Sequence, residues 1–497
     1  MSRDSTDGDA DGGDETVVRR DRFSGGPARD FLSSLAGDER IFAADLAVDR
    51  AHVVMLAEQG IIGDDEAGDI LDALAAVETA GHGALSGGED VHEAIESAVI
   101  DRVGPDGGKM HTARSRNDEV AACIRYRLRV DLLEAIESTL ALREALIDAA
   151  AEHTDTLMPG YTHLQPAQPI TVGHYLLSYA STVGRDTARL LDAYDRTNES
   201  PLGGAAFAGT PFDIDRERTA ALLGFDGVVD NSMDASSARD FLTESTAALA
   251  IHATTLSGLA EDIVIFANKD YIDLSDDYSS TSSIMPQKKN PDTLELTRAV
   301  AGDAIGELTG LLSTLKGLPR AYNRDLQRAH PHTFRAVDAV VEASAVAAGA
   351  VSTATWNEEL LAAEAGAGFS TATGIADLLA MAGLPFRTAH EVVALAAEEA
   401  EDAETEVSTA LLDAATEEVL GESLFEYVEE SAVDDALDPA QSVDSRDSQG
   451  GPAAEAVKST ITGARETLAV DSDALADRRA ALDDAETALQ EAVDEYV

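Results

Sequence analysis

The sequence predicts an all-α fold in which long helices form a central bundle, and two observations support this prediction. Residues 117–157 contain neither glycine nor proline, and apolar residues recur there at every fourth position: Val120, Ile124, Leu128, Leu132, Ile136 and Leu140. Further stretches with helical periodicity cover residues 171–198, 232–269, 290–316 and 332–363, each flanked by Gly, Pro, Ser or Asn. Helices longer than the usual range of about 8–20 residues favour packing side by side in a bundle.

The rest of the chain predicts two smaller helical domains beside the bundle and an N-terminal tail. Residues 1–16 are rich in Asp and Gly, so we expect a disordered acidic tail. We expect an N-terminal helical domain over residues 17–114, a central five-helix bundle over 115–369 and a small C-terminal helical domain over 370–497. A chain of 497 residues, 44% of them apolar, has enough material for several buried cores.

The charge balance excludes two classes of partner. The chain has 93 acidic and 36 basic residues, for a formal net charge of -57. Such a surface repels phosphates and anionic lipid head groups, so neither nucleic acid nor a membrane is an expected partner. Because self-repulsion destabilises a compact chain unless ions screen it, we interpret the acidity as adaptation to concentrated salt. An ordinary acidic protein is the alternative.

The remaining composition indicates a cytoplasmic protein. Cys123 is the single cysteine, which excludes an intrachain disulfide and predicts a buried, unreactive thiol. The first 16 residues contain neither a basic region nor an apolar one, so they do not resemble a signal peptide. No uninterrupted apolar run approaches the roughly 20 residues that cross a bilayer. We therefore expect a soluble, cytoplasmic protein.

A loop over residues 279–292 has the features of an anion site. The chain contains six lysines, and two of them, Lys288 and Lys289, are adjacent in this hydroxyl-rich loop. Asn290 suits the N-cap of a following helix and Pro291 its first turn, so free backbone N–H groups are expected to face the loop. The alternative is a capped surface loop with two solvated lysines.

Two other segments carry candidate site residues. His163 lies in a connection rich in Pro and Gly, over residues 159–169, where an imidazole can serve as a general acid or base. Arg114, Arg116 and Asn117 lie at the start of the first long helix, an arrangement that binds carboxylates. Each segment also has an ordinary explanation, namely a structural or exposed histidine and a solvated helix start.

The sequence predicts neither a metal nor a cofactor. His92, Glu93 and Glu96 match the zinc-protease helix pattern only in part, because a glutamate stands where the second histidine belongs. Neither a glycine-rich dinucleotide fingerprint nor a phosphate-binding loop is present. Tyr322 and Gln327 belong to a polar cluster that fits either a site or a hydrogen-bonded turn.

Together these segments resemble the fumarase/aspartase superfamily, and within it the argininosuccinate lyase family. The run Ser-Ser-Ile-Met-Pro-Gln-Lys-Lys-Asn-Pro over residues 282–291 is similar to the core shared by the superfamily. Four features resemble the argininosuccinate branch: Gln287 with Lys289, the run Gly-Tyr-Thr-His-Leu-Gln over 160–165, Arg-Ser-Arg-Asn-Asp over 114–118 and Asn-Ser-Met-Asp-Ala over 231–235. The resemblance implies an all-α homotetramer with sites built from several subunits, which eliminates fumarate from argininosuccinate and leaves arginine.

The resemblance also implies roles for individual residues. Ser282 removes the Cβ proton, Lys288 stabilises the dianionic intermediate, and His163, oriented by Glu295, manages proton delivery to the leaving group. The implied substrate-binding residues are Ser34, Arg116, Asn117, Thr162, Arg239, Asn290, Tyr322 and Gln327. The guanidine leaving group is very basic and departs readily once protonated, so a strong acid is unnecessary.

Three positions depart from the family pattern, and two other functions stay open. Thr281 and Ala113 stand where glycine is usual, and His330 stands where a substrate-binding lysine is common. We expect His330 to weaken carboxylate binding and to make it depend on pH near neutrality. The alternative functions are another fumarate-releasing lyase, acting on adenylosuccinate or aspartate, and a non-catalytic structural relative.

Overall fold

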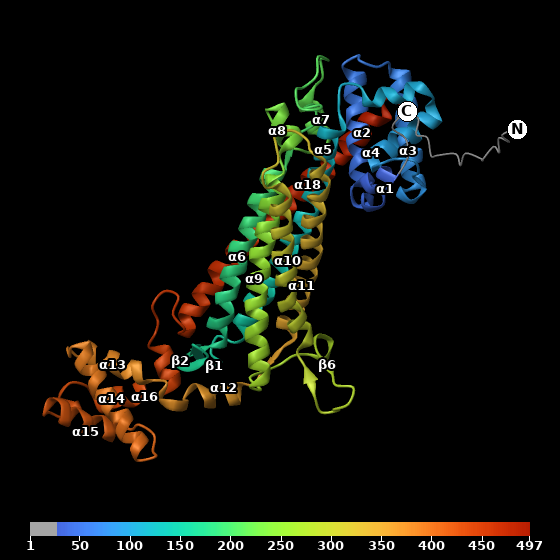
Figure 1. Ribbon diagram of the computed structural model, residues 1–497. Coiled ribbons are helices and arrows are strands. Elements are labelled where there is room, and N and C mark those ends of the chain that lie inside the picture. Colours follow the sequence, from blue (N-terminus) through green and yellow to red (C-terminus); the bar gives the residue numbers. More distant parts are fainter. Residues whose placement is uncertain (1–26) are drawn as a thin grey trace, which may run out of the picture.

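The computed structural model describes residues 27–497, and the predicted acidic tail over residues 1–16 lies outside this range. The all-α prediction is confirmed. Figure 1 shows long helices side by side in an extended bundle with smaller helical units at its two ends. The bundle consists of α5 (Arg116–Glu152), α6 (Val172–Thr197), α9 (Asp240–Asn268), α10 (Asp292–Leu315) and α11 (His330–Thr353).

The start of the longest bundle helix agrees with the sequence. Ser115 is the N-cap of α5, and its hydroxyl oxygen accepts a hydrogen bond from the backbone N–H of Asn117 at 3.3 Å. The Asp118 carboxylate in turn accepts a hydrogen bond from the backbone N–H of Ser115 at 3.0 Å, which completes a capping box. With 37 residues at about 1.5 Å each, α5 spans about 55 Å. This length separates the two ends of the bundle.

Three predicted helices end or break at positions that the periodicity of their apolar residues does not indicate. α5 ends at Glu152 because an antiparallel hairpin follows, formed by β1 (Leu157–Thr162) and β2 (Gln165–Thr171). The predicted helix over 232–269 breaks at Arg239 into α8 (Ser232–Ser237) and α9. The predicted helix over 332–363 breaks at β8 (Thr355–Trp356), which pairs with β5 (Ile272–Asp273), before α12 (Glu358–Ala365).

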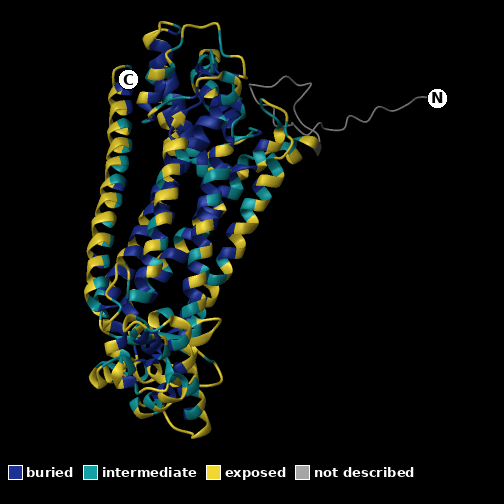
Figure 2. Ribbon diagram, turned by 90° about the vertical axis from the view of Figure 1, so that its left-hand side faces the viewer, coloured by how far each residue is buried: buried dark blue, intermediate teal, exposed yellow. Residues whose placement is uncertain are grey.

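The N-terminal helices cover one end of the bundle. They are α1 (Pro27–Leu32), α2 (Glu39–Glu58), α3 (Asp64–Ala80) and α4 (Val91–Val103). Their apolar side chains continue into the core around the first half of α5, where Met55, Leu74, Ile95 and Leu128 are fully buried. Figure 2 shows this end as the most continuously buried part of the molecule. The remaining short elements near it are α7 (Arg216–Leu222), β3 (Glu199–Ser200) and β4 (Gly227–Val228).

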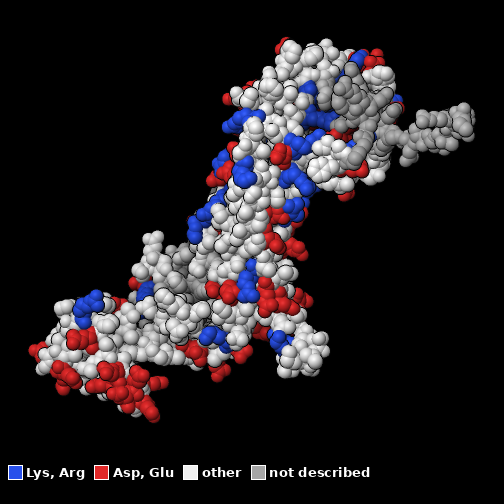
Figure 3. Space-filling model, viewed as in Figure 1, with Lys and Arg blue, Asp and Glu red and all other residues white. Residues whose placement is uncertain are grey.

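A further core lies along the second half of the bundle, and the small unit at the opposite end has a separate, smaller core. This unit is built from α13 (Ala372–Met381), α14 (Phe386–Asp402), α15 (Thr409–Leu420), α16 (Glu430–Leu437) and α17 (Pro439–Asp444). Figure 3 shows acidic side chains gathered on this unit, where Glu417, Glu418, Glu422 and Glu426 are exposed.

The last helix returns along the bundle. α18 (Ala454–Asp494) packs against α5 and α6, although the predicted domain over 370–497 includes it with the small C-terminal helices. Residues at heptad spacing face the bundle: Ile461, Leu468, Leu475, Leu482 and Leu489. Arg143 of α5 also lies 2.6 Å from Asp471. This heptad stripe is the reason that α18 belongs with the long helices.

Two helical stretches, α9 and residues 324–353, are long and apolar enough to cross a membrane by length and composition. Both lie in the bundle, where 50% and 44% of their most apolar windows are buried. Their apolar character is accounted for by packing against the other bundle helices.

Candidate active site

The predicted site residues lie at opposite ends of the bundle. One group lines a cavity of about 190 Å³ beside the N-terminal helices. Of the predicted substrate-binding residues, this cavity contains Ser34, Arg116, Asn117, Arg239, Tyr322 and Gln327. His330 lines it as well. The structure therefore brings together residues that are up to 296 positions apart in the sequence, from Ser34 to His330.

Arg116 and Asn117 enter the cavity from the first turn of α5. The Arg116 guanidinium lies 3.1 Å from a carboxylate oxygen of Asp90 and 3.6 Å from one of Glu93. The Asn117 side-chain amide donates to the backbone carbonyl of Ala206 at 3.0 Å. Both residues are half-buried, so the ends of these side chains are held in position and remain accessible from the cavity.

Arg239 is a buried cation without a carboxylate partner among residues 27–497. It lies at the break between α8 and α9, is 3% exposed, and donates from Nη1 to the Ala238 carbonyl at 2.7 Å. Its Nε has no hydrogen-bond partner in the described part of the chain. Burial and the nearby Arg125 lower the pKa of Arg239 to about 10, which leaves it charged at neutral pH. A buried charge of this kind favours an anionic occupant of the cavity.

His330 is uncharged in the cavity wall. It is the first residue of α11, is 6% exposed, and its Nδ1 lacks a partner among the described residues. Burial, followed by the charges of Arg239 and His92, lowers the pKa of His330 to about 3. The expected change of charge near neutrality therefore does not arise at His330, because the imidazole loses its proton far below that pH.

The other cavity residues are fixed by local hydrogen bonds. The Ser34 hydroxyl donates to the Asp38 carboxylate at 2.8 Å. The Gln327 amide donates to the Leu32 carbonyl at 3.1 Å. Burial raises the pKa of Tyr322, so its phenol stays protonated and can donate a hydrogen bond. These three groups add neutral donors beside the cations.

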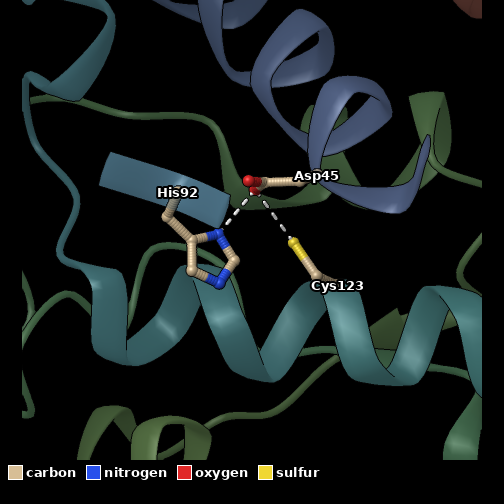
Figure 4. Close-up of side chains that lie close together, drawn as sticks. All are labelled: Asp45, His92 and Cys123. Carbon is tan, nitrogen blue, oxygen red and sulfur yellow. Dashed lines mark hydrogen bonds and ion pairs between the residues drawn. The ribbon is translucent and has the colours of Figure 1, made fainter. Parts of the chain in front are cut away.

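A buried network of charges behind the cavity was not predicted. Figure 4 shows Asp45 of α2 between His92 of α4 and Cys123 of α5. Nδ1 of His92 lies 2.8 Å from Oδ1 of Asp45, and the Cys123 thiol donates to the same oxygen at 3.2 Å. The predicted burial of the thiol is confirmed, and burial raises its pKa well above the ordinary value.

The network has a second half around Arg114. Its guanidinium lies 2.5 Å from Asp49 and 3.0 Å from Glu119. Asp45, Asp49 and Glu119 approach closely enough to hold a metal ion, but Arg114 and His92 already supply positive charge to these carboxylates. The signal in the sequence was the spacing of Asp45 and Asp49, which puts two acids on the buried face of α2.

His163 and Thr162 lie at the far end of the bundle, in the β1–β2 hairpin. Thr162 pairs with Gln165, so His163 and Leu164 form a two-residue turn in which both have positive φ, at 56° and 58°. This geometry is that of a type I′ turn and presents His163 at the tip of the hairpin. Both Thr162 and His163 are exposed, so this part of the proposed site is open to contact from outside the chain.

Ser282 and Lys288 lie in the loop between β6 (Ser280–Thr281) and β7 (Lys289–Asn290), which Figure 1 shows at the same end. The Ser282 backbone N–H donates to the Lys288 carbonyl at 3.2 Å, which closes the loop. The Ser282 hydroxyl oxygen accepts bonds from the N–H groups of Ile284 at 3.3 Å and Met285 at 3.0 Å. Two N–H donors on one hydroxyl oxygen favour its negatively charged form.

The start of the following helix differs from the prediction. Asn290 pairs with Ser280 in the two-stranded sheet, so it has extended geometry and Pro291 occupies the N-cap of α10 instead. The Ser280 hydroxyl donates to the Asp292 carboxylate. Both adjacent lysines are exposed; Lys289 lies 3.2 Å from Asp273 and 3.1 Å from Asp276, and no ion pair of Lys288 is found among residues 27–497.

Glu295 is exposed in the first turn of α10, and no hydrogen bond or ion pair joins it to His163 within residues 27–497 of one chain. The cavity residues and the group formed by Ser282, Lys288 and His163 are likewise not brought together within one chain. The length of the bundle keeps them apart, as Figure 1 shows.

Comparison with known proteins identifies the family. The family model described as "Lyase" matches residues 33–306, and the model described as "Argininosuccinate lyase C-terminal" matches residues 369–444. An argininosuccinate lyase of Natronomonas pharaonis is 68% identical over 489 residues, which are 98% of each chain. That of Haloarcula marismortui is 65% identical over 488 residues, again 98% of each chain.

A solved structure has the same fold. The crystal structure of an EDDS lyase in complex with formate is 35% identical, covers 95% of this chain and 96% of its own, and superposes with a TM-score of 0.86. The two argininosuccinate lyases exceed 60% identity over 98% of this chain. The chain therefore belongs to the argininosuccinate lyase family.

Proposed function

We propose that the protein catalyses the elimination of fumarate from argininosuccinate, which leaves arginine. The observation that carries this proposal is the identity of 68% with an argininosuccinate lyase over 98% of both chains. The cavity is consistent with it, because Arg239 is a buried cation without a carboxylate partner in the part of the chain that the structure describes, and argininosuccinate carries carboxylates. A cytoplasmic location and a surface adapted to salt are part of the same proposal.

We propose that Ser282 is the base. A serine hydroxyl is a weak base in water, and the two backbone N–H groups that donate to its oxygen support its alkoxide form. Removal of the Cβ proton leaves a second negative charge beside a carboxylate, and an adjacent cation lowers the energy of this intermediate. Lys288, exposed in the same loop, fits that role.

His163 fits the role of managing proton delivery to the leaving guanidine. Its position at the tip of a tight hairpin gives the imidazole a defined direction and keeps it accessible. We propose that Glu295 orients it across a subunit contact, since no bond joins them in one chain over the described residues. The proposed substrate-binding residues are Ser34, Arg116, Asn117, Thr162, Arg239, Asn290, Tyr322 and Gln327.

We propose that the enzyme is a homotetramer whose sites combine residues from different subunits. Within one chain, the cavity and the Ser282 loop lie at opposite ends of a bundle about 55 Å long. Exposed apolar residues along the bundle also favour association: Ile251, Leu296, Ile305 and Leu312. Antiparallel packing of bundles brings the Ser282 loop of one copy to the cavity of another.

An assay of fumarate release tests the proposed function against its rivals. The protein in concentrated KCl is incubated separately with argininosuccinate, adenylosuccinate and aspartate, and fumarate is followed by ultraviolet absorbance. We expect release from argininosuccinate alone, and loss of turnover with an intact oligomer in Ser282→Ala. Release from another substrate favours another lyase of the superfamily, and release from none favours a non-catalytic relative.

A further inference from the structure

His92 lies in the wall of the cavity with its two ring nitrogens in different surroundings. Nδ1 is shielded from solvent and lies 2.8 Å from the Asp45 carboxylate. No hydrogen bond to Nε2 is found among residues 27–497, and the ring lines the cavity. The side chain is 4% exposed and that of Asp45 is 0% exposed, so the ring has a single orientation. Nδ1 therefore faces Asp45 as an ion-pair partner, and Nε2 is the nitrogen left for a ligand of the cavity.

The charges around His92 favour its protonated form. Acidic groups face it from three elements: Asp38, Asp45 and Asp49 of the α2 region, Asp90 at the start of α4, and Glu119 of α5. The other titratable or cationic groups near it are Cys123, His111, Arg114, Arg116, Arg239 and His330. Burial opposes the charge, but Asp45 and the other carboxylates outweigh burial and raise the pKa of His92 to about 10.

The two histidines of the cavity therefore differ in charge. No carboxylate of residues 27–497 offsets the burial of His330, which is neutral, whereas His92 is an imidazolium at the same pH. The Nε2–H of an imidazolium that lines a cavity can donate a charge-assisted hydrogen bond, and such bonds are strong to carboxylates. Arg239, also in the cavity wall, adds a second cation.

We propose that His92 binds a carboxylate of the substrate through Nε2, and that Asp45 is the positioning residue that keeps its imidazole charged and correctly oriented. This inference rests on the proposed function, because it takes argininosuccinate as the occupant of the cavity. Cys123 supports the arrangement by donating to the same Asp45 oxygen.

Steady-state kinetics of two variants and their combination test the proposal. In Asp45→Asn the buried imidazole loses its counter-charge and becomes neutral near pH 8, so we expect the KM for argininosuccinate to rise about tenfold or more, with little change in kcat. Lowering the pH towards about 6 restores the proton and lowers KM. His92→Gln raises KM equally at every pH. The double variant matches His92→Gln, because Asp45 acts through His92.

Asp131→Asn is the matched control. Asp131 is also fully buried and ion-paired, to Arg40 at 3.1 Å and Arg127 at 2.6 Å, but it does not line the cavity. We expect its KM to stay near the wild-type value and to be independent of pH. The proposal is overturned if the KM of Asp45→Asn is unchanged or does not depend on pH. It is also overturned if the effects of Asp45→Asn and His92→Gln on KM add in the double variant.

If the variants do not fold, the pH dependence of the KM of the wild-type protein tests the proposal instead. A KM that is constant between about pH 6.5 and pH 9 supports the charged His92, and a tenfold rise across neutrality overturns it. Failure of the proposed function is distinct, because the wild-type protein then releases no fumarate from argininosuccinate under any of these conditions.

Discussion

Arg114 and Asp49 form a buried ion pair that joins the start of α5 to α2, with Nη2 of Arg114 2.5 Å from Oδ1 of Asp49. Arg114 stands two residues before Arg116 and three before Asn117, both of which line the cavity. Ala113, immediately before it, has a positive φ of 66°, so the chain turns sharply at this point. The ion pair therefore fixes the segment that carries two of the proposed substrate-binding residues.

Replacing Arg114 by leucine is expected to destabilise the protein by about 3–5 kcal/mol, because it leaves Asp49 and Glu119 buried without their cation. Urea unfolding in concentrated KCl measures the loss. Arg465→Ala is the control, since Arg465 pairs with Asp148 at the exposed surface and its loss should cost less than about 1 kcal/mol. Equal losses of unfolding free energy in the two variants would show that the buried ion pair contributes no more to stability than the exposed one.

The free energy of unfolding is expected to fall as the pH rises above neutrality. Folded His92 keeps its proton up to about pH 10, whereas an unfolded histidine loses it near its ordinary pKa of about 6.5. Between these values the folded state binds more protons, so the free energy of unfolding decreases as pH rises. Burial also raises the pKa of Glu119 to about 8, which acts in the same direction up to that pH. Melting temperatures from pH 7 to pH 10 should decline more steeply for the wild type than for His92→Gln; parallel curves would contradict this.

Substitution of His330 by lysine is expected to lower the KM for argininosuccinate about tenfold, because it puts a charge where the imidazole is neutral. The same change adds another buried cation beside Arg239 and His92, so the melting temperature should fall. Initial rates and a thermal scan of the two proteins test both parts. An unchanged KM would mean that no carboxylate approaches this position.

Removal of salt is expected to destabilise the protein. A net charge of -57 produces self-repulsion that ions screen over about 3 Å at 1 M but over about 30 Å at 0.01 M. The acidic patch on α15 and the segment after it contains like charges at close range. The melting temperature should rise steadily with KCl concentration, and a flat dependence would argue against adaptation to salt.

The fold was largely predictable because it rests on local signals. The repeat from Val120 to Leu140 identifies α5, and Ser115 with Asp118 marks its start. The position of α18 was not predicted, since its heptad stripe has meaning only against a partner surface. The break at Arg239 was also missed, because neither glycine nor proline marks it.

The sequence proposes a set of candidate site residues, but it does not indicate how they are arranged. His163, Ser282 and Lys288 occur in distinctive local sequences. The spacing of Asp45 and Asp49 indicates two acids on one face of α2, but no local pattern identifies His92, 47 residues away, as the partner of Asp45. Nor does any local pattern indicate that Ser282 and the cavity lie at opposite ends of one chain.

The central claim is that one active site combines the cavity of one chain with the Ser282 loop of another, and mixing two inactive variants tests it most directly. Ser282→Ala lacks the base, and Asn117→Ala is altered in the cavity. After the two are dissociated together and reassembled in concentrated KCl, some sites receive an intact cavity from one chain and an intact Ser282 from the other. We predict fumarate release from argininosuccinate well above that of either variant reassembled alone. Activity that stays at the level of the separate variants would contradict the account.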